Sequence, residues 1–170
     1  MKQISRFIIT LLLIACYSCN NHDERGLYTP LAIVAELEPR SEIIPFADMT
    51  PEERREYPRT NYVVNAPEDL PDDKVFGMQD IIAANVDFSR YTLLINYNLI
   101  PGYIFGHRYY WQYDNTLEQY ELGCWFKASE LDWDEESDLP EDWTYYRGAV
   151  IVNKISSNAT VAFSYSTHND

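Results

Sequence analysis

Cysteine and basic residues are scarce in this chain of 170 residues. It contains 3 cysteines, and its 13 lysines and arginines stand against 27 aspartates and glutamates, which gives a net charge of −14. This balance argues against nucleic acid or anionic lipid as a partner, because both require a basic face. Beyond the N-terminal segment the only cysteine is Cys124, so no disulfide can form within the rest of the chain. Its apolar, alternating surroundings predict a buried thiol.

Long apolar runs are also missing. Residues 7–15, FIITLLLIA, are apolar apart from Thr10 and follow two basic residues, Lys2 and Arg6. That run has signal-peptide length and is well short of the roughly 20 residues that a membrane-spanning helix needs. We therefore expect residues 1–15 to be a cleaved leader, residues 16–29 a tether and residues 30–170 one domain. Loss of the two basic residues would bring the net charge to about −16.

The leader ends in LIAC, residues 13–16. This segment resembles the lipobox of bacterial lipoproteins, which implies that Cys16 carries lipid and that the protein is anchored in the cell envelope, at the outer membrane. Cys19, preceded by a serine, is the alternative lipidation site, and an ordinary leader with incidental cysteines is the remaining interpretation. Three acyl chains would exceed the two signals that stable anchoring requires. The polar residues 20–24 resemble the tether of Bacteroidetes-type lipoproteins, which is associated with export to the outer surface.

The first half of the chain is broken by prolines and holds short elements. Residues 31–37, LAIVAEL, predict a first strand, after which Pro39 and the later prolines interrupt the chain. Thr50 followed by Pro51, Glu52 and Glu53 predicts the N-cap and first turn of a short helix. Residues 62–64 predict a short strand.

Alternation with a period of two dominates from residue 86 onwards. It predicts five strands joined by short turns, and hence a mainly β or β-rich α+β domain with a largely antiparallel meander sheet or sandwich and one or two short helices near its N-terminal side. The residues expected to share a face within each strand are Tyr91, Leu93, Ile95, Tyr97 and Leu99; Tyr103, Phe105, His107, Tyr109, Trp111 and Tyr113; Tyr120, Leu122, Cys124 and Phe126; Tyr146, Gly148, Val150 and Val152; and Val161, Phe163 and Tyr165.

Residues 86–95, VDFSRYTLLI, open this region. They resemble a segment of small secreted Bacteroidetes-type lipoproteins and, more distantly, the C-terminal domain of protease-complex stabilising proteins of the PrcB type. The resemblance spans about ten residues. It implies a compact β-rich domain and carries no catalytic residue.

The candidate contact residues are aromatic. Tyr109, Trp111 and Tyr113 lie on one strand, and Trp133 and Trp143 lie in or beside an acidic segment; together they predict a surface that grips a protein partner, since Tyr and Trp are frequent anchors at interfaces. The alternative is that the strand face is part of the core.

Residues 130–142, ELDWDEESDLPED, form that acidic segment. The spacing of Asp132, Asp134, Glu136 and Asp138 is similar to the start of a calcium loop. An EF-hand requires Gly at its sixth position and Glu at its twelfth, where this chain has Ser137 and Trp143. A looser calcium site, a solvated acidic loop and an acidic patch that contacts a basic partner are all open interpretations. We expect no cofactor.

Motifs for catalysis are missing as well. The sequence contains no G-x-S-x-G, P-loop, G-x-G-x-x-G or H-E-x-x-H segment, and His107 has no supporting triad pattern. We therefore expect a non-enzymatic, lipid-anchored binding or accessory protein. The alternatives are a glycan-binding accessory of a surface uptake system, a protease inhibitor and an envelope-assembly lipoprotein.

Overall fold

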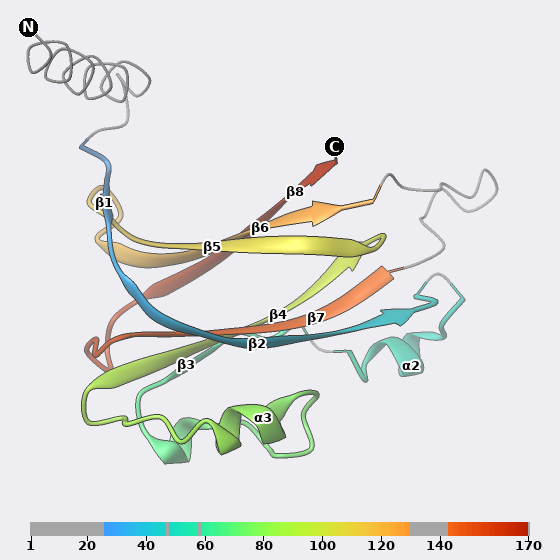
Figure 1. Ribbon diagram of the computed structural model, residues 1–170, viewed down its shortest axis with the longest axis horizontal. Coiled ribbons are helices and arrows are strands. Elements are labelled where there is room, and N and C mark those ends of the chain that lie inside the picture. Colours follow the sequence, from blue (N-terminus) through green and yellow to red (C-terminus); the bar gives the residue numbers. More distant parts are fainter. Residues whose placement is uncertain (1–25, 47, 58, 130–142, 170) are drawn as a thin grey trace, which may run out of the picture.

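The computed structural model describes residues 26–46, 48–57, 59–129 and 143–169. In Figure 1 two sheets of four strands lie one above the other; we call the sheet with strand order β1-β5-β6-β8 sheet A and the one with order β2-β7-β4-β3 sheet B. The strands are β1 (Tyr28–Pro30), β2 (Ile33–Ile44), β3 (Tyr62–Val64), β4 (Tyr91–Pro101), β5 (Ile104–Asp114), β6 (Gln119–Ala128), β7 (Trp143–Asn153) and β8 (Val161–Asn169). The fold is a mainly β, mostly antiparallel sandwich in one compact domain, as the alternation predicted.

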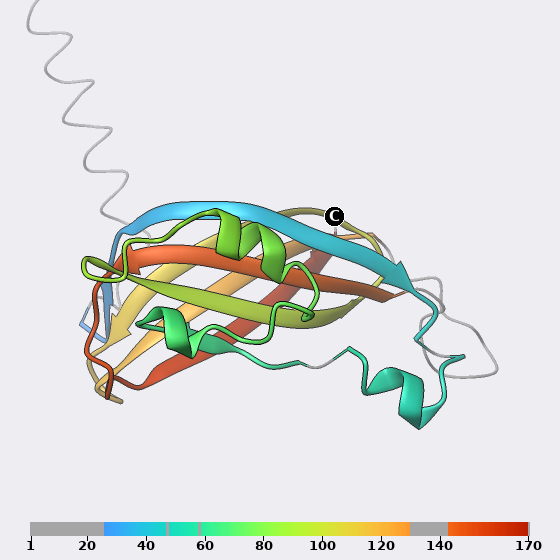
Figure 2. The ribbon, with the colours of Figure 1, turned by 90° about the horizontal axis from the view of Figure 1, so that it is seen from below.

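The short helices lie on the far side of sheet B. They are α2 (Pro51–Arg54), the 3-10 helix η1 (Pro67–Asp69) and α3 (Met78–Ala83). Figure 2 shows α3 across the near face of sheet B and α2 toward one end of that sheet. The predicted cap of α2 is confirmed, because the Glu53 N–H donates to Thr50 Oγ1 at 3.3 Å and the Thr50 N–H donates to Glu53 Oε2 at 2.7 Å.

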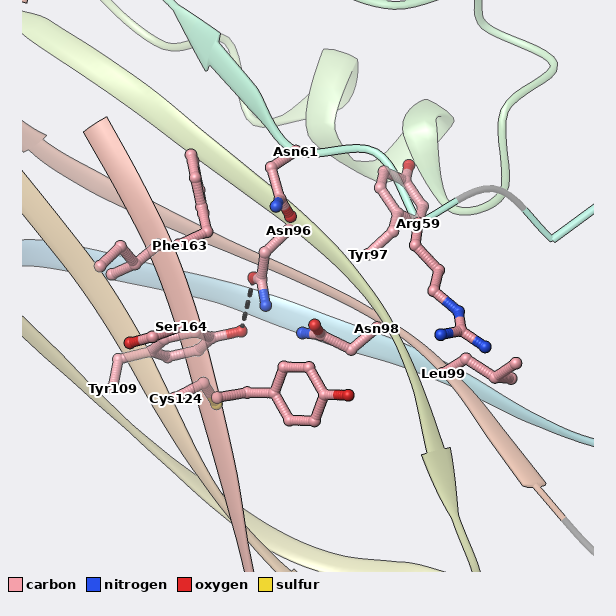
Figure 3. A pocket seen from close by; sticks show the side chains of 12 residues that line it. Arg59, Asn61, Asn96, Tyr97, Asn98, Leu99, Tyr109, Cys124, Phe163 and Ser164 are labelled. Carbon is pink, nitrogen blue, oxygen red and sulfur yellow. Dashed lines mark hydrogen bonds between the residues drawn. The ribbon is translucent and has the colours of Figure 1, made fainter. Parts of the chain in front are cut away.

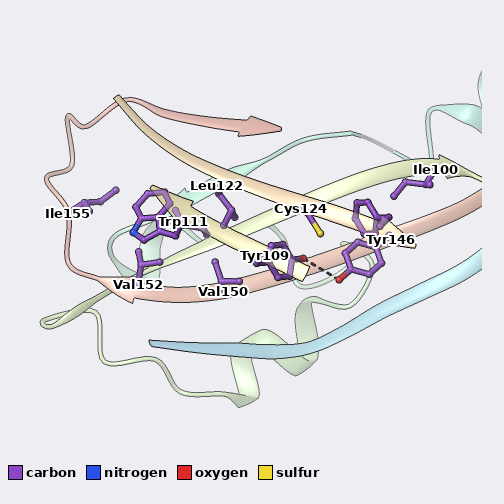
Figure 4. Close-up of a cluster of buried hydrophobic side chains, with 11 residues drawn as sticks. Ile100, Tyr109, Trp111, Leu122, Cys124, Tyr146, Val150, Val152 and Ile155 are labelled. Carbon is purple, nitrogen blue, oxygen red and sulfur yellow. Dashed lines mark hydrogen bonds between the residues drawn. The ribbon is translucent and has the colours of Figure 1, made fainter. Parts of the chain in front are cut away.

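Apolar side chains fill the space between the two sheets. Trp111, Leu122, Cys124 and Phe126 of sheet A meet Val150 and other inward residues of sheet B there (Figure 4). The inward face predicted for β6 is therefore confirmed. Cys124 is buried as expected.

A second core lies between sheet B and the helices. The face predicted for β4 packs here, where Leu93, Ile95, Tyr97 and Leu99 meet Met78 and Ile81 of α3. The opposite face of β4 is also buried, because Leu94 and Ile100 point into the space between the sheets. Sheet B is thus the middle layer of three.

The two long sides of the sandwich differ. On one side β1 and β2 follow one another almost directly along the chain, so a nearly continuous strand links the edge of sheet A to the edge of sheet B. On the other side β8 is the edge of sheet A, and β3 covers β4 only over residues 93–95. The sandwich is therefore linked along one side and more open along the other, next to residues 96–101 of β4.

Paired strands are farther apart in the sequence than they would be in a simple meander. β8 pairs in parallel with β6, and β7 lies between β2 and β4 although both precede it by many residues. Consecutive strands pair directly only in β3–β4 and β5–β6 of the described chain.

Two strand irregularities depart from the sequence expectation. β2 continues through Pro39 to Ile44 instead of ending near residue 37, with a register shift between Leu37 and Arg40. Proline is tolerated there because β2 is an edge strand and the shift removes the need for its missing N–H. Tyr28 and Thr29, assigned to the tether by the sequence, pair with β5.

The second irregularity is in β5. A register shift between Ile104 and Gly106 changes the phase of its alternation, so Tyr103 and Phe105 are exposed whereas Tyr109 and Trp111 point inward. The expectation that all six residues share one face is thus wrong for the first two. A bulge adds one residue and reverses the side to which the preceding side chains point.

Arg147 holds the helical layer against sheet B. Its guanidinium is completely buried, donates from Nη1 to the Glu38 carbonyl at 3.0 Å and lies with Nη2 3.5 Å from Asp80 Oδ2. Gly77 passes directly over it with φ +71°, and a Cβ there would lie 2.7 Å from Arg147 Nε. Only glycine combines this left-handed backbone with such a close approach.

Candidate functional site

The predicted contact residues fall into different places in the fold. Tyr109 and Trp111 are 7% and 5% exposed in the core between the sheets, where Trp111 stacks on Tyr120 with ring centroids 5.1 Å apart. Tyr113 is half-buried at the β5–β6 turn, and Trp143 packs on Phe46 at the start of β7. The two most buried side chains therefore offer no surface to a partner. Outside the described residues lie Cys16, Cys19, Trp133 and the possible calcium ligands Asp132, Asp134, Glu136 and Asp138.

Exposed aromatic side chains are found instead on the outer face of sheet A. Phe105 is 70% exposed and Trp125 is 43% exposed. The β5–β6 register places two cationic residues near them, because Arg108 lies opposite Trp125 and Lys127 lies opposite Gly106. The Arg108 guanidinium lies 5.8 Å from the Trp125 ring centroid, within cation–π range. We call Phe105, Arg108, Tyr110, Trp125 and Lys127 the outer aromatic face.

A hydrogen-bonded network fixes the neighbouring part of this face. Glu121 accepts from Ser164 Oγ at 2.7 Å, from Gln112 Nε2 at 2.8 Å and from the Tyr110 hydroxyl at 3.2 Å. The Tyr110 ring lies directly over Gly123, where a Cβ would come within 1.8 Å of the ring. Burial raises the pKa of Tyr110 above its usual value. The phenol is thereby held in one orientation beside Trp125, with ring centroids 5.4 Å apart.

A second site opens between the sheets on the open side of the sandwich. It is a pocket of about 160 Å³ with Arg59 and Asn61 at the segment before β3, and Asn96 and Asn98 on β4 (Figure 3). Leu122 and Phe163 are among the apolar residues that line it. We call it the edge pocket.

The inner wall of the edge pocket is built around Tyr109. Its hydroxyl donates to Asn96 Oδ1 at 3.0 Å and lies 3.2 Å from the Tyr146 hydroxyl. Gly148 makes this possible, because a Cβ there would lie 1.5 Å from the Tyr109 oxygen. Burial raises the pKa values of Tyr109 and Tyr146 far above their usual range, so both phenols remain neutral donors and acceptors.

Cys124 and His107 do not form a nucleophile–base pair in either site. Burial raises the pKa of the Cys124 thiol to about 12, which leaves almost no thiolate near neutral pH. His107 Nε2 lies 3.7 Å from Glu36 Oε2, and its ring packs against Tyr109 and Tyr146 instead of facing a nucleophile. What both sites offer is binding chemistry: exposed aromatic surface in one, amide and guanidinium groups in the other.

Two features are absent from the residues that the structure describes. Among those residues, no three His, Cys, Asp or Glu side chains come together in a way that could hold a metal ion. Within them, too, no helix has the length and apolar character to cross a bilayer.

Sequence signals for both sites existed in part. Trp125 alternates with the inward residues Leu122, Cys124 and Phe126 in such a way that it must point outward. Asn96 and Asn98 interrupt an otherwise apolar strand, which is a signal for a special environment. The exposure of Phe105 carries no such signal, because it depends on the bulge.

No protein-family model, no curated protein and no solved structure matches this chain. The resemblances drawn from LIAC and from residues 86–95 therefore stay predictions.

Proposed function

We propose that this protein is a lipid-anchored, non-enzymatic accessory protein of the bacterial cell envelope that binds a protein partner through the outer aromatic face. The observation that carries the proposal is the exposure of Phe105 and Trp125 beside Arg108 on one sheet face. Trp and Arg are the residue types most enriched among the side chains that dominate protein–protein binding energies. The rigid neighbouring network lowers the entropic cost of binding there.

Charge favours an acidic or neutral partner surface. In a chain with a net charge of −14 this face presents Arg108 and Lys127, and Glu121, a carboxylate beside it among the described residues, already accepts from three donors. A cationic rim of this kind steers association with a surface of opposite charge. The contact is thereby different from the acidic one that the sequence suggested at residues 130–142.

Site-specific photo-crosslinking in intact cells tests the proposal. A photoreactive residue at position 125 should give a discrete crosslinked protein product, whereas the same residue at position 117 should not. Leu117 is the matched control, since it is an exposed apolar residue in the turn between β5 and β6. Arg108→Glu should reduce the product from position 125. Equal products from both positions, or one that is insensitive to Arg108→Glu, would contradict the proposal.

A glycan-binding accessory is the second candidate. It is favoured by Trp125 itself, whose exposed ring stands beside the Tyr110 phenol and the polar Glu121 network. A glycan array with the purified domain separates the two candidates: saturable binding to one glycan class that Trp125→Ala abolishes would favour sugar over protein as the partner.

The anchor is tested separately by metabolic labelling with an alkynyl fatty acid. We expect Cys16→Ala to remove the label and Cys19→Ala to leave it, with fractionation placing the labelled protein in the outer membrane. A label that survives both single substitutions and the double substitution would contradict lipid anchoring.

A further inference from the structure

The edge pocket is lined by side-chain amides that use few of their hydrogen-bonding groups among the described residues. Asn98 is only 8% exposed, and within the described part of the chain its side-chain amide makes no hydrogen bond. Asn96 uses Oδ1 to accept from Tyr109, and its Nδ2 has no acceptor among the same residues. Unused donors and acceptors that line a pocket are available to water or to a bound group.

The charge of the pocket indicates the sign of that group. Arg59 is the one charged residue among those that line it, and no carboxylate joins it there. Its guanidinium lies 5.9 Å from the centroid of the Phe46 ring, and none of its five N–H donors makes a hydrogen bond with another described residue. In Figure 3 the Asn98 amide is directed toward Asn96, and the Arg59 guanidinium lies near Leu99. An anionic, hydrogen-bonding ligand complements this lining.

The size of the pocket indicates how large the ligand is. Its volume of about 160 Å³ is below the roughly 300–1,000 Å³ of typical small-molecule sites. It therefore suits a group of about one amino-acid residue. Leu99, Leu122 and Phe163 supply apolar wall for a short side chain, and the asparagine amides match the donor and acceptor of a peptide group.

We propose that the edge pocket binds a carboxylate that carries a neighbouring amide, as found at the C-terminal residue of a peptide or in a free N-acylated amino acid. Arg59 pairs with the carboxylate. Asn98 and the free Nδ2 of Asn96 bind the amide. This proposal does not depend on the outer aromatic face, which lies on the opposite side of sheet A.

Titration followed by ¹H–¹⁵N NMR tests the site, with the Asn side-chain amide and Arg Nε signals as reporters. The probes are an N-acetylated tripeptide ending in leucine with a free carboxylate, the same peptide with an amidated C-terminus, and N-acetyl-leucine. We expect saturable shifts of the Asn98 and Arg59 signals with the free carboxylate, and little change with the amidated peptide. N-acetyl-leucine distinguishes the sources: binding as tight as that of the tripeptide indicates a free small acid, and weaker binding indicates a peptide end.

Two variants and two matched controls complete the experiment. Arg59→Gln, at an exposed position, and Asn98→Asp should each weaken binding of the free carboxylate by about tenfold or more, because hydrogen bonds to charged groups are the stronger class. Arg90→Gln is the control for the first, since Arg90 also lies over an aromatic ring, that of Tyr91, but away from the pocket. Asn153→Asp, at an exposed asparagine on β7, is the control for the second.

Three outcomes would overturn the proposal. These are the absence of saturable shifts with all three probes, which would mean that water alone satisfies the amides; equal binding of the amidated peptide; and binding that Arg59→Gln leaves unchanged. Because Arg59 is exposed, its substitution keeps the test valid even if Asn98→Asp does not fold.

Discussion

Gly148→Ala is the substitution whose cost the structure defines most sharply. A Cβ at this position would lie 1.5 Å from the Tyr109 oxygen and 2.6 Å from Asn96 Oδ1, and separations below 3.0 Å are not seen for real Cβ atoms. Tyr109 must therefore leave its place between the sheets. That movement breaks its hydrogen bonds to Asn96 and Tyr146.

The expected destabilisation follows from these losses. Each of two hydrogen bonds contributes about 0.5–1.5 kcal/mol, and forcing extra volume into a packed core costs about 1–3 kcal/mol, so the total is roughly 2–6 kcal/mol. For a domain of this size each kcal/mol corresponds to about 2–4 °C in Tm, which gives a decrease of roughly 4–24 °C. Thermal unfolding followed by circular dichroism, with urea unfolding followed by Trp fluorescence, measures both quantities.

Gly106→Ala is the matched control, because the Cβ it adds to β5 meets nothing within 4 Å. There we expect no loss, and a gain of up to about 1 kcal/mol from the reduced backbone entropy of the unfolded chain. A double-mutant cycle adds specificity: Tyr109→Phe removes the oxygen at 1.5 Å, so Gly148→Ala should cost less in that background by about 0.5–3 kcal/mol. A Gly148→Ala protein with the Tm of the Gly106→Ala protein, or an additive cycle, would refute the argument.

The remaining predictions concern titration. Burial raises the pKa of Tyr97 and of Cys124 to about 12, from ordinary values of 10.0 and 9.0, so the folded state holds these protons more tightly than the unfolded state does. Tm should therefore be constant up to about pH 9 and fall as the pH rises toward 12. A Tm that stays constant to about pH 11 would contradict this prediction. The Cys124 thiol should also resist a disulfide reagent at about pH 8 until the protein is unfolded, and rapid labelling of the native protein would count against its burial. The hydrogen bond from Arg40 lowers the pKa of Asp80, whose carboxylate is also the counter-charge of the buried Arg147. Asp80→Asn should lower Tm at neutral pH, and its difference in Tm from wild type should shrink as the pH falls below the ordinary carboxyl pKa of 3.8. A difference in Tm that does not depend on pH would contradict this role of the Asp80 charge.

Local patterns allowed part of the fold to be predicted. The capping residues of α2 and the inward face of β6 depend on side-chain spacing within a few residues, and both are confirmed. The phase change in β5 was not predictable in this way, because the bulge near Gly106 leaves no mark in the alternation of aromatic residues. Alternation also does not say which face of an aromatic strand is buried, so the sequence placed the aromatic contact surface on Tyr109 and Trp111 instead of Trp125.

Long-range pairing escaped prediction for a different reason. The position of β8 beside β6, parallel to it, depends on which exposed edge is free once the other strands are in place. The edge pocket exists only because of that choice, since it brings Phe163 of β8 close to Asn96 and Asn98 of β4. The two asparagines alone could suggest a buried polar site, although neither its shape nor the participation of Arg59 could be read from them.

The central position of β7 in sheet B has a consequence for how the protein is made. Because β7 separates β2 from β4, neither of these strands has its main partner until residues 143–153 have been synthesised, and Ile33 then pairs with Val152 near the other end of the chain. Contacts of such high sequence separation make folding slow, because loop closure precedes the gain from pairing. Slow folding is compatible with the secretion predicted from the N-terminus, since it leaves time for an unfolded chain to cross a membrane before the last strands pair and complete the sandwich.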